Sequence, residues 1–128
     1  MSKRSDRPIF DAAALLALIQ LEPGLERLAP LCDEAAVGAV NLAEVQAKLV
    51  SKGMPPKEAK AACDALHLEE LPFDSAHAIL SARYVQKGVS LGDRCFLATA
   101  SLHGTGWTSD RRLTALECDK PPSIKLFR

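Results

Sequence analysis

The sequence predicts an α/β domain in which helices cover both faces of a mainly parallel sheet. Short apolar runs alternate along the chain with segments of helical periodicity, which is the pattern of successive strand–helix units. The chain has 128 residues, enough for a hydrophobic core, and 48% of them are hydrophobic, which excludes a disordered chain. No internal repeat or low-complexity linker divides the sequence, so residues 1–128 are predicted to form a single domain.

The predicted strands are short and apolar, and turn or capping residues bound them. Strands are expected at Pro8–Phe10, Ala35–Val40, Leu68–Phe73, Thr105–Thr108 and Ser123–Phe127. Helices begin at caps or prolines and end at glycines. They are expected at Ala12–Ile19, Leu25–Leu31, from Asn41 to Gly53, from Pro55 to Leu66, from Asp74 to Val85, at Leu91–His103 and at Arg111–Leu116. The helix Leu91–His103 is apolar nearly all round, which predicts a central position.

Composition excludes several classes of protein. Lys plus Arg and Asp plus Glu each number 16, so net charge does not steer the whole chain toward nucleic acid. No apolar run reaches the roughly 20 residues that span a bilayer, and the basic start Met1–Arg7 lacks the features of a signal peptide. The four cysteines contain no C-x-x-C pair, which argues against zinc and predicts reduced thiols. A cytoplasmic protein without a membrane segment is therefore expected.

Four acidic residues lie where an apolar run meets a predicted helix: Asp11, Glu44, Asp93 and Asp110. Each has a structural explanation, because acids cap helices and favour the first helical turn. Together they follow or flank strand ends, and ligands of parallel sheets bind beyond the carboxyl ends of the strands. Asp74 also follows a predicted strand, but its context is that of a simple helix cap.

Converging carboxylates indicate a bound cation, because an unpaired buried charge is costly. Oxygen ligands alone favour Mg²⁺ or Mn²⁺, and phosphate-ester hydrolysis is the reaction that such a site performs best. Arg94, Arg111 and Arg112 each lie beside one of these acids. They are predicted either to hold substrate phosphates, as we expect for Arg94 and Arg111 in particular, or to balance the neighbouring carboxylates.

The motifs around these acids resemble the PIN-domain family, specifically the VapC-type toxins of bacterial toxin–antitoxin pairs. The matching segments are Phe10–Leu16, Val40–Val45, Leu91–Ala98 and Thr108–Arg111, with Leu71–Asp74 as a weaker companion. The resemblance covers nearly the whole chain, and its specificity lies in the order and spacing of the motifs. The chain departs from the family at Ala13, where Ser or Thr is common, and in its short first strand.

The resemblance implies a three-layer α/β/α fold and a Mg²⁺- or Mn²⁺-dependent endoribonuclease. It also implies a homodimer and inhibition by a small antitoxin protein. It assigns catalytic roles to Asp11, Glu44, Asp93 and Asp110. Asp11 and Asp93 are the expected metal ligands, Glu44 binds metal or orients water, and Asp110 binds a second ion or acts through water.

Three other interpretations were weighed. The chain could be a non-catalytic protein- or nucleic-acid-binding module that docks a partner on the helix pair Asn41–Leu66. A helix-turn-helix around Gly53 lacks the expected excess of positive charge. A phospho-accepting receiver-like domain would need a Lys after its last strand, and Lys120 and Lys125 are wrongly placed for that role.

Overall fold

The structure, a computed structural model that describes residues 6–128, contains a five-stranded sheet in which all neighbouring strands are parallel. The strand order is β3-β2-β1-β4-β5. The strands are β1 (Pro8–Phe10), β2 (Ala36–Gly38), β3 (Glu69–Leu71), β4 (Thr105–Thr108) and β5 (Ile124–Leu126). The predicted parallel sheet is confirmed. Residues 1–5, and with them most of the basic start of the chain, lie outside the described residues.

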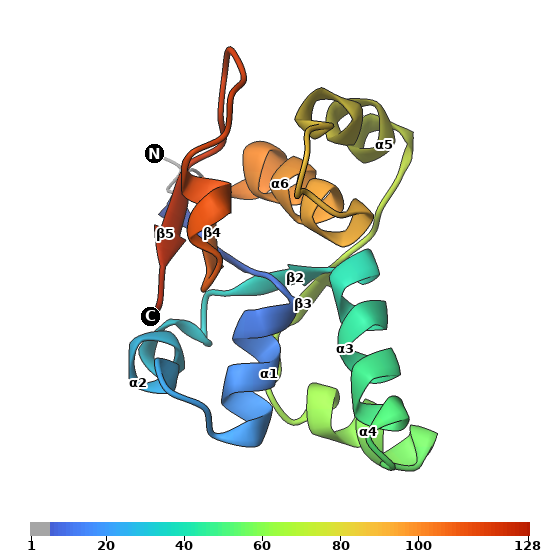
Figure 1. Cartoon of the computed structure of the whole chain (residues 1–128). Helices are drawn as coiled ribbons and strands as arrows, with labels where there is room; N and C mark the ends of the chain where they lie inside the picture. The colour runs from blue at the N-terminus through green and yellow to red at the C-terminus, as the bar shows by residue number, and fades with distance from the viewer. Residues whose placement is uncertain (1–5) are drawn as a thin grey trace.

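Helices cover both faces of this sheet and give the three layers that the resemblance implies (Figure 1). The helices α1 to α4 lie on one side, and α5 and α6 lie on the other. Their bounds are α1 (Ala12–Gln20), α2 (Leu25–Leu28), α3 (Ala39–Ser51), α4 (Pro56–Asp64), α5 (Ser75–Ser81) and α6 (Leu91–His103). Short 3-10 segments follow at η2 (Ala29–Leu31), η3 (Ala82–Tyr84) and η4 (Arg111–Thr114).

Successive side chains of β1 point to opposite faces of the sheet and contribute to the hydrophobic core on each face. Phe10 packs with Val37 and Leu15 beneath α1 to α4, whereas Ile9 packs with Phe96 beneath α5 and α6. Both β1 side chains are completely buried. A central strand buried on both faces reads as a continuous apolar run, which is why so short a segment was recognisable in the sequence.

Several predicted elements are shorter in the structure. The strand predicted at Ala35–Val40 ends at Gly38, and the helix predicted from Asn41 begins already at Ala39. The last residue of β2, Gly38, pairs with Leu71 of β3 and is at the same time the N-cap of α3. The helices predicted to extend to Val85 and over Arg111–Leu116 tighten into η3 and η4.

The prediction for α6 is confirmed in its bounds and in its central position. Phe96 and Leu97 on this helix are fully buried. Leu91 and Leu102, which the sequence placed on its apolar surface, are 62% and 46% exposed. The helix is therefore exposed to solvent near both of its ends. Among the described residues, no helix is long and apolar enough to cross a membrane.

The four cysteines are free thiols, as the sequence predicts. Cys63 and Cys95 are buried, and Cys32 and Cys118 are half-buried. Burial raises the pKa of the Cys63 and Cys95 thiols, which favours the unreactive protonated form. These thiols act as small apolar side chains of the core.

Candidate active site

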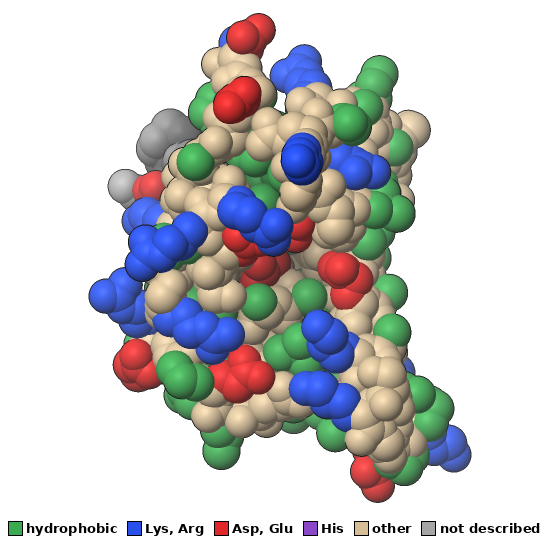
Figure 2. Space-filling model, in the orientation of Figure 1, with side chains coloured by type: hydrophobic (Ala, Val, Ile, Leu, Met, Phe, Trp, Pro, Cys, Tyr) green, Lys and Arg blue, Asp and Glu red, His purple; other side chains and the backbone are tan. Residues whose placement is uncertain are grey.

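The strand order reverses between β1 and β4, and the acidic residues lie near the carboxyl ends of the strands at that point. The chain leaves β1 for β2 on one side and reaches β4 on the other side, which makes this edge a topological switch point. Asp11 follows β1, and Asp110 lies two residues beyond Thr108, the last residue of β4. Figure 2 shows acidic side chains in a hollow of the molecular surface, with Lys and Arg side chains around it.

Asp11 is the most deeply buried of the four acids, with a residue exposure of 8%. It is the N-cap of α1, and one carboxylate oxygen accepts a hydrogen bond from the Ala14 backbone N–H at 2.9 Å. A second bond joins its side chain to that of Thr108. Burial and, to a smaller extent, the negative charges of Asp93 and Glu44 raise the pKa of Asp11 to about 6, against the lowering effect of the two hydrogen bonds.

Glu44 lies on the first half of α3 and faces the start of α6. Asn41 donates one amide hydrogen bond to Glu44 Oε1 at 2.6 Å and another to the Gly92 carbonyl at 3.2 Å. A Cβ at position 92 would overlap the Glu44 carboxylate, so Gly92 leaves room for Glu44 to lie against the start of α6. The spacing of Asn41 and Glu44 resembles a capping box, but that interpretation is wrong, because α3 begins at Ala39 with Gly38 as its N-cap.

Asp93 is in the first turn of α6 and forms a capping box with Ser90. Its carboxylate accepts from the Ser90 backbone N–H at 3.0 Å, and the Ser90 hydroxyl accepts from the Asp93 backbone N–H at 3.1 Å. The helix therefore presents Asp93 with one oxygen engaged by Ser90. Its charge still influences Asp11, which places both acids at the same edge of the sheet.

Asp110 is held by Arg112 and Thr108. Its Oδ1 accepts from Arg112 Nε at 3.0 Å, and its Oδ2 accepts from Arg112 Nη2 at 2.7 Å, which is a bidentate ion pair. Arg112 thereby holds the pKa of Asp110 below its usual value. The Asp110 backbone N–H donates to the Thr108 hydroxyl at 3.1 Å. Because Thr108 also bonds Asp11, this one buried hydroxyl connects the ends of β1 and β4.

The four acids supply the ligand chemistry of a divalent cation, but they are not gathered closely around one point. Among residues 6–128, no group of three or more His, Cys, Asp and Glu side chains is already arranged to hold a metal ion. Each carboxylate instead has a protein partner: Thr108, Asn41, Ser90 or Arg112. The pKa of Asp11 is raised first by burial and then by like charges, and a nearby divalent cation would favour its ionised form.

The three arginines beside the acids differ in their contacts. Arg94 donates from Nη1 to the Val89 carbonyl at 3.3 Å, next to the N-terminus of α6. Arg111 is exposed at the start of η4, and Arg112 binds Asp110. Asn41 and Thr108 are the site residues that sequence reasoning missed. The spacing of Asn41 three residues before Glu44 on one helix face was a usable signal, whereas the double role of Thr108 depends on tertiary contacts.

Asp74 is a helix cap, as the sequence predicts. It forms a capping box with His77, whose Nδ1 lies 2.6 Å from Asp74 Oδ1. His77 Nε2 lies 3.0 Å from His103 Nε2, which joins α5 to the end of α6. His77 is buried.

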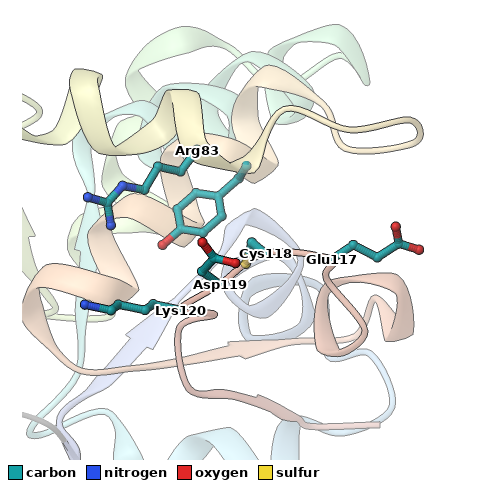
Figure 3. Close-up of a pocket in the computed structure, with 6 residues that line it drawn as sticks. Arg83, Glu117, Cys118, Asp119 and Lys120 are labelled. Atoms are coloured by element: carbon teal, nitrogen blue, oxygen red, sulfur yellow. The ribbon is translucent and has the colours of Figure 1, made fainter.

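Two hollows of similar volume differ in their relation to the four acids. One, of about 530 Å³, lies between α1 and α3 and is lined by Ala12, Ala13, Leu16, Glu44, Ala47, Lys48 and Ser51. The other, of about 520 Å³, lies between η3 and the loop after η4 (Figure 3). It is lined by Arg83, Tyr84, Glu117, Cys118, Asp119 and Lys120. The second hollow contains none of the four predicted acids, and its two basic and two acidic side chains offset one another.

The family model of the PIN domain matches residues 9–117. The chain therefore belongs to the PIN-domain family, as the sequence motifs indicated. Nucleases of this family are generally dependent on divalent metal ions. The matched region contains all four acids of the candidate site. No protein with curated annotation matches the chain.

Solved structures with the same fold include toxin–antitoxin complexes. The DNA-bound VapBC from Salmonella typhimurium aligns with a TM-score of 0.75 and 19% identity, over 96% of this chain and 99% of that chain. VapBC2 from Rickettsia felis, bound to a DNA fragment from its promoter, aligns with a TM-score of 0.70 and 14% identity, over 93% and 97% of the two chains. VapBC-5 from Mycobacterium tuberculosis aligns with a TM-score of 0.60 and 21% identity, over 95% of this chain and 98% of that chain.

Proposed function

We propose that this chain is a divalent-metal-dependent endoribonuclease and the toxin of a toxin–antitoxin pair. The observation that carries the proposal is the environment of Asp11. This carboxyl is buried, its pKa is raised to about 6, and the charges of Glu44 and Asp93 act on it. Retaining mutually repelling carboxylates at a switch point costs stability, which is the expected cost of a site built for a cation.

Asp11, Asp93 and Asp110 are the proposed ligands, and Glu44 completes the catalytic acids. A bound Mg²⁺ or Mn²⁺ supplies a Lewis acid for phosphodiester hydrolysis and lowers the pKa of water toward neutrality. Asn41 fixes the Glu44 carboxylate, and Thr108 fixes the spacing between the ends of β1 and β4. These contacts hold the acids on rigid helix and strand ends, which limits reorganisation during the reaction. The expected products carry a 5′-phosphate and a 3′-hydroxyl.

Positive side chains at the rim are proposed to position the RNA. Arg111 is next to Asp110 in the sequence and is exposed, so a phosphate arriving from solvent can reach it. Arg94 is half-buried and bonded to Val89, so its predicted contact with substrate would require it to leave that carbonyl. Guanidinium groups suit this role because they bind phosphate oxygens in pairs.

The proposed partner is a small antitoxin protein encoded with this chain. The similar solved structures are VapBC complexes, and they align over almost the whole of both chains. The apolar hollow between α1 and α3 includes Glu44 in its lining, so a partner segment seated there would cover the acidic edge. A cytoplasmic homodimer is the remaining part of the proposal.

RNA cleavage by the purified chain tests this function. We expect cutting in Mg²⁺ or Mn²⁺, loss of cutting in excess chelator, and loss of cutting in an Asp11→Asn/Asp93→Asn double variant. Asn keeps the helix-capping oxygen at position 11, so the variant should fold. Cleavage that continues undiminished in chelator would contradict the mechanism. A folded wild type that neither binds the ion nor cuts RNA would instead favour a non-catalytic binding module.

A further inference from the structure

Arg112 forms an ion pair with one of the candidate acids, Asp110. It binds both oxygens of Asp110 and also receives a backbone contact, because Asp110 Oδ1 accepts from the Arg112 backbone N–H at 3.0 Å. The charge of Asp93 acts on the same guanidinium. Arg112 therefore supplies the positive charge that neutralises Asp110 at this end of the site.

We propose that Arg112 is an exchangeable counterion that leaves Asp110 when the divalent ion binds and then contacts an RNA phosphate. The inference rests on the proposed function and adds to it a residue that couples ion binding to substrate binding. Arg112 donates to both Asp110 oxygens, so its hydrogen bonds and its positive charge both oppose the approach of a divalent ion to this carboxylate. The ion and the guanidinium compete for the same two atoms.

The surroundings of Arg112 permit this exchange. Its side chain is 66% exposed, so water can solvate the guanidinium as soon as it leaves Asp110. An exposed ion pair of this kind contributes little net stability, because solvent competes for both charges. On its other side Arg112 faces Gly88, and a Cβ added at Gly88 would lie 3.4 Å from Arg112 Nη1. The absence of a side chain at position 88 leaves room for the guanidinium to turn toward solvent.

The neighbouring arginines do not share this arrangement. Arg94 is half-buried and donates to a neutral carbonyl, that of Val89. Arg112 instead is paired with a charged group that has a competing function. A released guanidinium beside the acids would be attracted to the charge of a phosphodiester, which places it where substrate arrives. Ion binding would thus prepare the phosphate contact.

The test is Mn²⁺ binding measured by calorimetry without RNA, in wild type, Arg112→Gln and the control Arg27→Gln. Arg27 is exposed on α2, so its replacement removes the same charge away from the acids. Loss of the competing guanidinium should tighten Mn²⁺ binding to Arg112→Gln about threefold to fivefold, the range set by the energy of an exposed ion pair. Arg27→Gln should bind Mn²⁺ as wild type does.

The second readout is RNA cleavage at saturating Mn²⁺. Arg112→Gln should lose about tenfold in kcat/KM, because one charge-assisted bond to phosphate is absent. Arg112→Lys, which keeps the charge without the bidentate fork, should recover part of that loss. Tighter Mn²⁺ binding together with slower cleavage is the signature of exchange. If Arg112 only held the site in shape, its replacement would weaken Mn²⁺ binding instead.

Unchanged or weaker Mn²⁺ binding in Arg112→Gln would overturn the exchange even if the wild type cuts RNA. Tighter Mn²⁺ binding with full cleavage activity would overturn the phosphate contact. A wild type that binds Mn²⁺ without cutting RNA would count against the proposed function, while the Mn²⁺ titrations would still decide the competition. Failure of the wild type to bind Mn²⁺ at all would overturn both.

Discussion

Asp11 and Asp110 follow neighbouring strands, yet their environments are opposite. Asp11 is buried, and burial raises its pKa to about 6. None of the groups that change this pKa is a basic side chain. The Asp110 side chain is 27% exposed and forms a bidentate pair with Arg112, which lowers its pKa. One carboxyl lacks a cation and the other already has one.

This difference indicates how one edge of a sheet can hold several acids without unfolding. Charge at β4 is neutralised by an exposed arginine, and charge at β1 is tolerated through hydrogen bonds from Thr108 and the Ala14 backbone. A buried carboxylate with a raised pKa is a marker of function, since structure alone would favour an apolar or paired residue there. Asp11 is therefore the expected centre of the site.

The largest predicted effect is on catalysis. Asp11→Asn should lower kcat by at least about 100-fold, beyond the 10–100-fold that loss of an outer-shell partner costs at metal sites. Asp110→Asn, at the position already neutralised by Arg112, should cost only about 10-fold. Cleavage kinetics in Mn²⁺ measure both values. Equal losses in the two variants would break the comparison.

The second prediction concerns stability and pH in the absence of divalent ions. The Asp11 carboxyl ionises near 6 in the folded chain and near its ordinary 3.8 in the unfolded chain, so the folded state keeps the proton between these values. Stability should therefore fall as pH rises from about 4 to about 6 and stay lower above it, by up to about 3 kcal/mol.

Asp11→Asn should remove this part of the pH dependence and raise the free energy of unfolding at neutral pH. Asn caps helices as well as Asp does, so the start of α1 is preserved. Denaturant unfolding at acidic and neutral pH, in chelator, measures the change. A variant less stable than wild type at neutral pH would show that the Asp11 charge is well compensated.

The third prediction separates the two carboxyls. Thr108→Val keeps the shape of the side chain but removes the hydroxyl that bonds Asp11 and accepts from the Asp110 backbone N–H. The loss should cost about 1–3 kcal/mol, the usual cost of leaving buried polar groups unpaired. It should also raise the pKa of Asp11 further, because the hydrogen bond favours its charged form. Chemical denaturation gives the first quantity, and nuclear magnetic resonance titration of Asp11 gives the second.

The smallest predicted effect belongs to the Asp110 pair. Asp110→Asn should change the free energy of unfolding of the ion-free protein by less than about 1 kcal/mol, since its partner Arg112 is largely exposed to solvent. Thermal unfolding in chelator, beside Asp11→Asn, provides the comparison. A loss of several kcal/mol would mean that this ion pair supports the fold and would weaken the case for its exchange.

The fold was predictable where local signals agree with tertiary contacts. Pro8–Phe10, Thr105–Thr108 and the helix Leu91–His103 were assigned with their observed bounds, because apolar periodicity and caps mark them. The end of β2 at Gly38 was missed, since it depends on pairing with the distant strand β3 and on the start of α3. The tightening into η3 and η4 was missed as well, because end geometry depends on packing.

The sequence singles out the four candidate acids but not the interactions of their carboxyl groups. Four acids at strand and helix junctions are visible in the sequence as caps with a possible second role. Their interactions are not visible, because the contact between Asn41 and Gly92 spans 51 positions of the chain. Which carboxyl is buried unpaired and which is neutralised likewise depends on distant elements that meet only in the folded chain.

The most direct test of the account is a calorimetric titration of Mn²⁺ into wild type and Asp11→Asn at neutral pH, without RNA. The account predicts saturable binding to the wild type and a large loss of affinity in a variant that remains folded. Mn²⁺ binding of equal strength in both proteins, or none in either, would contradict the claim that Asp11 is the centre of a cation site.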